Sequence, residues 1–151
     1  MRRVLCVQLL TVGLAGLLTG CSGSSDKWVQ GREPVHPISG RVTLKGEPVE
    51  GAILIFHSTA KELSAQGRTD ADGNYSVTTY EDGDGAVLGE HIVTVRKTKE
   101  VKKPTKYHTE DEPSYATFTE ELLPKESSSK QTSKLRVTVA EGGSADVNFE
   151  F

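Results

Sequence analysis

Apolar side chains recur at every second position in several short stretches of the chain, and turns rich in glycine, proline or acidic residues separate them. A period of two is typical of a β-strand that buries one face. The stretch Tyr75–Thr79 follows this pattern directly after the turn residues Asp70–Asn74, where Asp and Asn bond their own backbone and glycine tolerates positive φ. The predicted strands are Ile38–Leu44, Ala52–His57, Gly67–Thr69, Tyr75–Thr79, Glu90–Arg96, Leu135–Val139 and Ala145–Phe151.

Two other segments do not alternate in this way. Ala52–His57 is almost continuously apolar, which predicts a central strand covered on both faces. Lys97–Pro124 is long, charged and without a sustained period, and we expect a loop that is either functional or disordered. About seven short strands, frequent turns and almost no helical pattern predict an all-β fold, a seven-stranded Greek-key β-sandwich.

The N-terminal residues have the layout of an export signal. Met1–Arg3 is positively charged, and Val4–Leu18 is apolar but too short for a confident membrane span. Residues 22–37 are mostly polar, with two prolines, and are typical of a flexible tether. We therefore predict a cleaved signal peptide over residues 1–20, a tether over 21–36 that begins with Cys21, and a β domain over 37–151.

The residues around the predicted cleavage site form a recognisable motif. Leu18–Cys21 reads Leu-Thr-Gly-Cys and resembles the lipobox of bacterial lipoproteins. The resemblance implies that Cys21 is diacylated on sulfur, becomes the mature N-terminus and anchors the protein to a membrane, since two or three acyl chains anchor stably. Ser22 favours the outer membrane over the inner one. The alternative is an ordinary secretory peptide that ends near a cysteine.

Two further motifs resemble a known family. Pro37–Ala52 follows the pattern G-x-V-x-x-x-G-x-P-v-x-G-A, and Thr69–Tyr75 follows T-D-x-x-G-x-Y. Both are similar to the carboxypeptidase regulatory-like domain, a transthyretin-like β-sandwich, and Gly89–Val95 with Leu122–Pro124 resembles small bacterial lipoproteins built from this domain. The resemblance implies the fold and carries little information on activity. Those relatives often have a Tyr shortly after the Leu-Pro, where this chain has Lys125–Ser128.

Charge and cysteine content narrow the function classes. The formal charge of −3 becomes −5 without residues 1–20, because 16 Lys and Arg then face 21 Asp and Glu. A mildly acidic domain without a basic stripe is a poor candidate for nucleic-acid binding. Cys6 would be removed with the signal, so Cys21 would have no partner for an internal disulfide.

Acidic turns are the candidate metal sites. Asp70 and Asp72 lie in the first turn, and Asp82 and Asp84 lie in the loop Glu81–Gly85; oxygen ligands on such loops suit Ca²⁺. The turn geometry alone also explains these residues, so we predict no bound metal and no cofactor. The four histidines lack the spacing of a zinc site.

Catalysis is not expected. The terminal Tyr-Arg-Gly-Ser of the hydroxyisourate hydrolases, which share the transthyretin fold, is replaced by Asn148–Phe151, and no Gly-x-Ser-x-Gly motif occurs. The long charged segment instead carries the ligand-binding candidates Tyr107, Tyr115 and Phe118, beside a basic cluster over Lys97–Lys106. Exposed aromatic and charged side chains together are typical of recognition surfaces. The alternative is a solvated linker whose aromatic residues cap the domain edge.

The sequence therefore predicts a non-catalytic, lipid-anchored cell-envelope protein whose β-sandwich serves adhesion, scaffolding or binding. Its expected partners are the membrane, through the lipid, and envelope proteins or cell-wall glycan. One alternative is a carbohydrate- or peptidoglycan-binding accessory module that serves a separate enzyme. Another is a calcium-stabilised structural domain.

Overall fold

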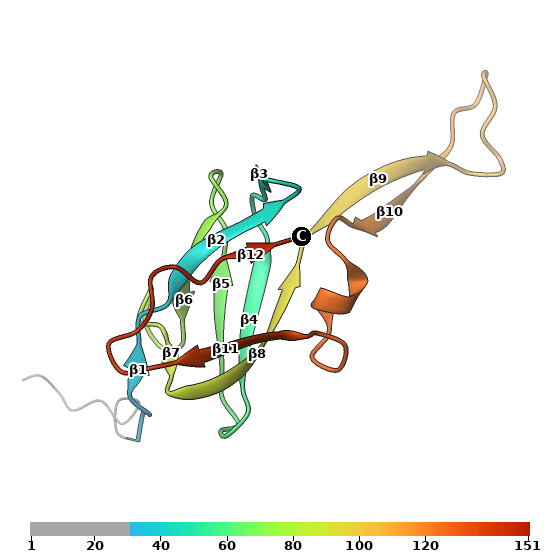
Figure 1. Ribbon diagram of the computed structural model, residues 1–151. Coiled ribbons are helices and arrows are strands. Elements are labelled where there is room, and N and C mark those ends of the chain that lie inside the picture. The colour runs from blue at the N-terminus through green and yellow to red at the C-terminus, as the bar shows by residue number, and fades with distance from the viewer. Residues whose placement is uncertain (1–30) are drawn as a thin grey trace, which may run out of the picture. The chain divides into compact units, whose positions relative to one another are not determined.

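A computed structural model describes residues 31–151 of the chain, so the predicted signal peptide and Cys21 lie outside the described residues. Glu33–Phe151 forms one compact unit. The fold is all-β, as predicted, with one short 3-10 helix, η1 (Figure 1). The elements are β1 (Val35–His36), β2 (Ser39–Leu44), β3 (Glu47–Pro48), β4 (Ile53–Ser58), β5 (Ser64–Arg68), β6 (Asn74–Thr78), β7 (Ala86–Val87), β8 (Gly89–Arg96), β9 (Thr98–Pro104), β10 (Tyr115–Glu121), η1 (Lys125–Ser128), β11 (Leu135–Val139) and β12 (Phe149–Glu150).

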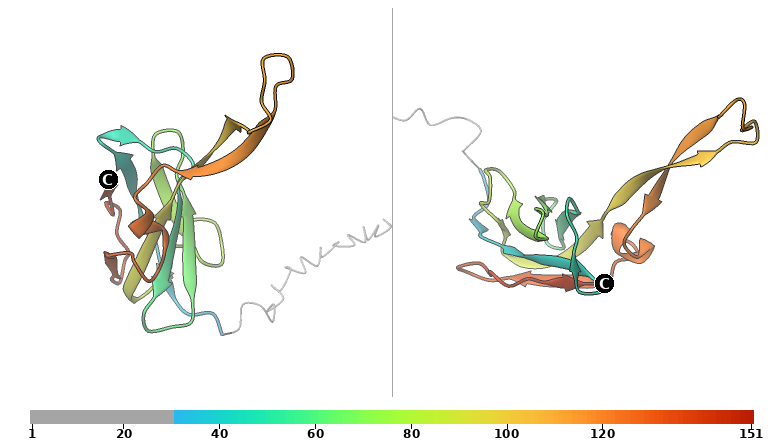
Figure 2. Two further views of the ribbon diagram at one scale, coloured as in Figure 1. Left: turned by 90° about the vertical axis from the view of Figure 1, so that its right-hand side faces the viewer. Right: turned by 90° about the horizontal axis from the view of Figure 1, so that it is seen from above.

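Eight of these strands form one main sheet. Its strand order is β11-β8-β4-β5-β6-β2-β12, with β3 paired to β2 as a side branch. The pairs are antiparallel except for β12, which runs parallel to β2. The sheet curls strongly (Figure 2), and its two end strands, β11 and β12, come to the same side of the unit (Figure 1). Two smaller ladders, β1–β7 and β9–β10, complete the fold.

The inner face of the curled sheet holds the core. Alternate side chains of β8 point inward, so His91, Val93 and Val95 are fully buried, as the sequence predicts. The Phe56 ring lies at the centre of the core, with ring centroids of Tyr75, His91 and Phe149 at 6.3, 6.4 and 6.5 Å. Every second side chain of these strands is therefore buried in the same core. The same alternation holds at Tyr75 and Val77 in β6.

The prediction that Ala52–His57 is covered on both faces is wrong. Leu54 and Phe56 are fully buried, whereas Ile53 is 49% exposed and Ile55 is only partly buried. Solvent reaches the outer face of β4, because no second layer covers the sheet at this place. An apolar run in a curled antiparallel sheet thus does not require burial on both sides.

The prediction of a loop over Lys97–Pro124 is also wrong. This segment contains β9 and β10, which pair over seven residues each, from Thr98–Glu121 to Pro104–Tyr115. The hairpin projects from the main sheet (Figure 1) and is exposed on both faces, so it lacks the apolar alternation that reveals half-buried strands. The structure likewise starts β5 at Ser64, inside a predicted connection, and places Val35–His36 of the predicted tether in β1.

Contacts besides the β12–β2 ladder also hold the C-terminal residues against the N-terminal part of the domain. The Tyr75 hydroxyl donates a hydrogen bond of 2.6 Å to the carbonyl of Val147, and the surrounding burial raises the pKa of the Tyr75 phenol. Gly40 leaves room for this approach, since a Cβ there would overlap the same Val147 carbonyl. Val147, Phe149 and Phe151 all pack against the core, but only Phe149–Glu150 of the predicted strand Ala145–Phe151 forms a strand.

Replacing Tyr75 with Phe should lower the free energy of unfolding by about 1 to 2 kcal/mol, because the Val147 carbonyl loses its hydroxyl donor while the ring packing is kept. Urea denaturation measures this change. Tyr107→Phe is the matched control, since Tyr107 is 71% exposed and should change stability little. Equal losses in both variants would contradict the assigned role of the hydroxyl.

The stability of the protein should fall as the pH falls below about 6.5, the ordinary pKa of histidine. Burial lowers the pKa of His91 despite the bond to the Gly89 carbonyl, so the unfolded chain takes up this proton more readily than the folded one. Neutral His91 therefore contributes its full share to the free energy of unfolding above the pKa of the unfolded state. This contribution is lost as the pH falls below that value. His91→Asn should flatten the dependence of melting temperature on pH between about 5 and 8. An unchanged slope would contradict this assignment.

Candidate functional site

The hairpin that leaves the main sheet is the candidate functional site, and we call residues 97–122 the arm. The chain enters the arm at the end of β8 and returns through η1 to β11, which pairs with β8 (Figure 2). Ser127 and Ser133 fasten this return, since their hydroxyls donate to the backbone carbonyls of Val95 and Val93. The arm is therefore an insertion between β8 and β11, and these two strands pair directly with each other at its base.

Local contacts order the far end of the arm, residues 105–114, which includes the tip, residues 107–114. Thr105 donates a backbone hydrogen bond to the Ser114 carbonyl, and His108 Nδ1 accepts one from the Ser114 N–H. The His108 ring meets the Tyr115 ring edge-on, with centroids 4.7 Å apart. Thr109 and Glu112 close the turn through both backbone and side-chain bonds. These short-range bonds explain how a tip with no core beneath it keeps a defined conformation.

The three aromatic candidates all lie on the arm, but they do not converge. Tyr115 and Phe118 are three residues apart on β10 and therefore point to opposite faces. Phe118 is 49% exposed and shares its face with Val101, its directly paired neighbour, and with the Lys103 ammonium 5.8 Å above its ring. Tyr107 lies in the tip, with the Lys106 ammonium 4.8 Å from its ring centroid. All three side chains are exposed, and their separation follows only from the register of β9 with β10.

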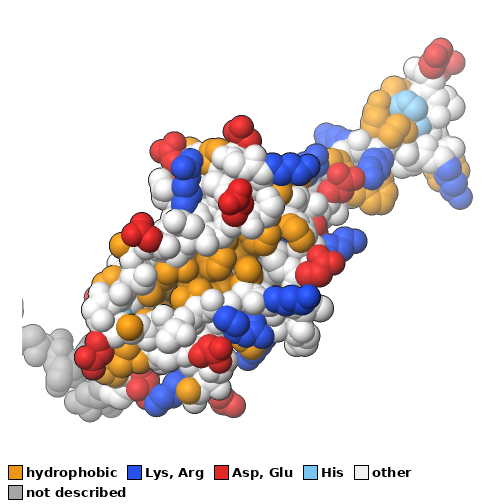
Figure 3. Space-filling model, viewed as in Figure 1, with side chains coloured by type: hydrophobic (Ala, Val, Ile, Leu, Met, Phe, Trp, Pro, Cys, Tyr) orange, Lys and Arg blue, Asp and Glu red, His pale blue; other side chains and the backbone are white. Residues whose placement is uncertain are grey.

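Charge is divided along the arm. Its stem, residues 97–106 and 115–122, carries five cationic and three anionic side chains, for a net charge of +2. Its tip, residues 107–114, carries Glu110, Asp111 and Glu112, for a net charge of −3. Figure 3 shows several blue side chains among red and orange ones along the stem, and red side chains at the far end of the tip. Lys103 contacts Glu120 at 2.7 Å, and this hydrogen bond and charge lower the pKa of the Glu120 carboxyl.

An apolar groove of about 520 Å³ lies at the foot of the arm. Leu44 and Val49 from the region around β3 contribute to it, and Leu122, 37% exposed, contributes from the arm. Lys97 and Lys45 stand at its border.

The calcium candidates are engaged by their own loops. The Asp70 carboxylate accepts hydrogen bonds from the backbone N–H groups of Asp72 and Asn74. The Asp84 carboxylate accepts three such bonds, at 2.7 to 2.9 Å, from the N–H groups of residues 79–81. Asp82 accepts a bond from the Thr78 hydroxyl at 3.4 Å. Within residues 31–151 no group of three His, Cys, Asp or Glu side chains is placed to hold a metal ion.

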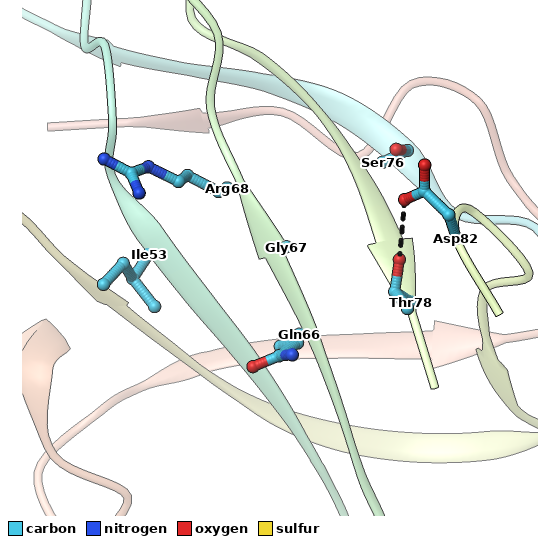
Figure 4. A pocket seen from close by; sticks show the side chains of 7 residues that line it. All are labelled: Ile53, Gln66, Gly67, Arg68, Ser76, Thr78 and Asp82. Atoms are coloured by element: carbon cyan, nitrogen blue, oxygen red, sulfur yellow. Dashed lines mark hydrogen bonds between the residues drawn. The ribbon is translucent and has the colours of Figure 1, made fainter. Parts of the chain in front are cut away.

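A second groove, of about 460 Å³, lies on the outer face of β4, β5 and β6 (Figure 4). Arg68 and Asp82 stand on opposite sides of it, and Gly67 contributes only backbone. The sequence analysis did not propose this surface; glycine inside a predicted strand was the available signal. Its side chains do not converge on a common point, so it is a weaker candidate than the arm.

Comparisons of the chain with models of protein families, with curated proteins and with solved structures gave no match. Among the described residues, 31–151, the structure contains no helix of the length and apolar character needed to cross a membrane.

Replacing Asp84 with Ala should lower the free energy of unfolding by about 1 to 3 kcal/mol, because three backbone N–H groups lose a charged acceptor. Asp82→Ala is the matched control in the same loop, with a single long hydroxyl contact to lose. Thermal melting with and without millimolar calcium completes the test, and we expect no calcium-dependent shift. A clear upward shift that Asp84→Ala abolishes would show that the loop binds the ion instead.

Proposed function

We propose that this chain is a non-catalytic, lipid-anchored cell-envelope protein whose β domain is a binding module and whose arm is the binding element. We further propose that the domain is a transthyretin-like, carboxypeptidase regulatory-like Greek-key sandwich, on the basis of its sequence motifs and its curled, largely antiparallel sheet. The observation that carries the function is the arm: a paired hairpin that projects from a packed domain with aromatic residues and separated charge exposed.

The energetics of the arm support a binding role. A two-stranded hairpin without a covering layer is marginally stable in water. In the arm, Tyr115 is 55% and Phe118 is 49% exposed, so a large part of their apolar surface gains nothing from burial in the free protein. A partner that covers either face would bury this surface. Binding and ordering of the arm would then reinforce each other.

The anchor is proposed from Cys21 and the residues around it. Below the domain, the lysine ammonium of Lys61 contacts Glu33 at 2.8 Å, and the Glu33 N–H donates to the Tyr80 hydroxyl. Glu33 is thereby fixed to the domain near β1, and the residues between Cys21 and Glu33 would serve as a short tether between lipid and domain. Such an arrangement would present the domain at a membrane surface.

One observation favours the glycan-binding alternative. Tyr107 and Tyr115 lie in or next to the tip and are the two most exposed aromatic side chains among the described residues. Exposed tyrosines offer flat apolar faces with a polar edge, which suits contact with sugar rings. An accessory role at the cell wall would use this end of the arm.

The anchor is tested by feeding a bacterial host that expresses the full chain an alkyne-bearing palmitate. We expect the wild-type protein to be labelled and to sediment with membranes, whereas Cys21→Ser should lose the label and become soluble. Cys6→Ser is the matched control and should keep both properties, since Cys6 lies within the predicted signal. Label and membrane association that survive in Cys21→Ser would overturn the anchor.

The arm is tested by sedimenting the detergent-solubilised full chain with purified cell-wall sacculi. Saturable retention that Tyr107→Ala and Tyr115→Ala abolish, and that Tyr80→Ala leaves intact, would support wall binding through the tip. Absence of retention in the wild type would remove the glycan alternative and leave a protein as the partner of the arm.

A further inference from the structure

We propose that the open edge of β10 pairs with β10 of a second copy of this chain, antiparallel and about a two-fold axis, to form a continuous four-stranded sheet β9-β10-β10′-β9′. The inference rests on the proposed role of the arm as the binding element and names its partner.

The backbone of β10 has hydrogen-bonding groups available for this pairing. Within residues 31–151, β10 pairs only with β9. At the ends of the ladder, the Leu122 N–H donates to Lys97 and the Ser114 carbonyl accepts from Thr105, so even-numbered residues turn their backbone groups toward β9. Strand alternation then directs the N–H and C=O of Tyr115, Thr117 and Thr119 away from β9. These three residues form the open edge.

The two edges of the arm differ in how they are protected against pairing. The edge strand β9 carries several lysines and ends in Pro104, features that hinder the addition of another strand. Tyr115–Thr119 in β10 reads Tyr-Ala-Thr-Phe-Thr, with no charge, no proline and mostly aromatic or β-branched residues. Such a segment has high strand propensity and no protective feature. The arm is thus open to strand addition on one side.

The side chains of β10 complement a second copy. A two-fold axis at Thr117 places Thr117 opposite Thr117′, Ala116 opposite Phe118′, and Tyr115 opposite Thr119′. Each exposed aromatic ring then faces a small or β-branched neighbour, and no like charges stand opposite each other. On one face, Phe118 lies between Val101 of its own arm and Ala116′ of the other. The pairing would cover apolar surface that is exposed in the single copy.

Charge favours the antiparallel direction. In this direction the acidic tip of each arm, with a net charge of −3, lies toward the foot of the other, where Lys97 and Lys125 are located and where Arg96 is paired with Glu121. A parallel pairing would bring two acidic tips together. Attraction between opposite charges at both ends therefore adds to the strand pairing at the centre.

The first test is a disulfide trap. The full chain is used with Cys6 and Cys21 replaced by serine, so that an introduced thiol is the only one and no lipid anchor contributes. Thr117→Cys should form a disulfide dimer under mild oxidation, because residues directly opposite in an antiparallel pair lie about 5.5 Å apart between Cα atoms, within the range of a disulfide. Lys102→Cys, directly opposite Thr117 within the same arm, is the matched control and should remain monomeric.

The second test uses the same cysteine-free chain without a trap. In sedimentation equilibrium its mass should rise with concentration from that of the monomer toward twice that value. Thr117→Lys places two lysines opposite each other and should raise the dissociation constant at least about tenfold. Thr98→Lys adds the same charge to the same face, on the protected strand, and should change it little. Both lysines are introduced at exposed or half-exposed positions, and circular dichroism checks that the variants fold.

A chain that stays monomeric at high concentration overturns the inference. So does equal disulfide formation by Thr117→Cys and Lys102→Cys, or equal weakening by Thr117→Lys and Thr98→Lys. These outcomes are separate from the proposed function, because palmitate labelling and sacculus retention are measured on their own variants. A monomer that still binds sacculi through Tyr107 and Tyr115 would leave the arm as the binding element and exclude only self-pairing.

Discussion

The domain depends on burying a single face of one continuous sheet around Phe56. His91 comes from β8, directly beside the Phe56 strand β4, whereas Tyr75 comes from β6, two strands away, and Phe149 comes from β12 at the far end of the sheet. The three rings nevertheless surround Phe56 at similar distances. Only a strongly curled sheet brings them together, because neighbouring strands of a flat sheet would carry these rings apart. The curl leaves the outer face to solvent, which is why Ile53 stays half exposed while its neighbour Leu54 is fully buried.

The strands that bury one face could be predicted from the sequence. Tyr75 with Val77, and His91 with Val95, alternate with polar residues because one side of each strand meets the core. The segment Thr98–Glu121 gave no such signal, since a hairpin exposed on both faces has no reason to alternate. The parallel pairing of β12 with β2 could not be predicted either, because pairing between segments distant in the chain leaves no local sequence pattern.

The candidate residues stand out in the sequence by their type, whereas their arrangement in space could not be predicted. Tyr107, Tyr115 and Phe118 stand out in sequence as aromatic residues in a charged segment, and all three are exposed. Their distribution over two faces and a tip depends on the register of β9 with β10, which no local feature specifies. In the acidic loop Glu81–Gly85, residue type suggested a role that the geometry explains differently. Asp84 suggested a metal ligand by type, whereas its position shows a carboxylate that accepts three backbone N–H groups.

The arm and the domain are structurally separable. Because β8 and β11 pair directly below the arm, and Ser127 and Ser133 fasten the returning chain there, the core is complete without the arm. Changes in the arm therefore leave Phe56 and its neighbours untouched. A binding surface can vary on such an insertion at little cost to the stability of the domain.

The pairing of β12 with β2 also has a consequence for folding. The Arg41 N–H donates to Asn148 Oδ1 across 107 positions of the chain, and Phe149 fills a place beside Phe56 in the core. The core around Phe56 is therefore complete only when two segments far apart in the chain have met. Closing such a long loop costs chain entropy before the contacts form, so this pairing raises the contact order of the fold and slows its folding.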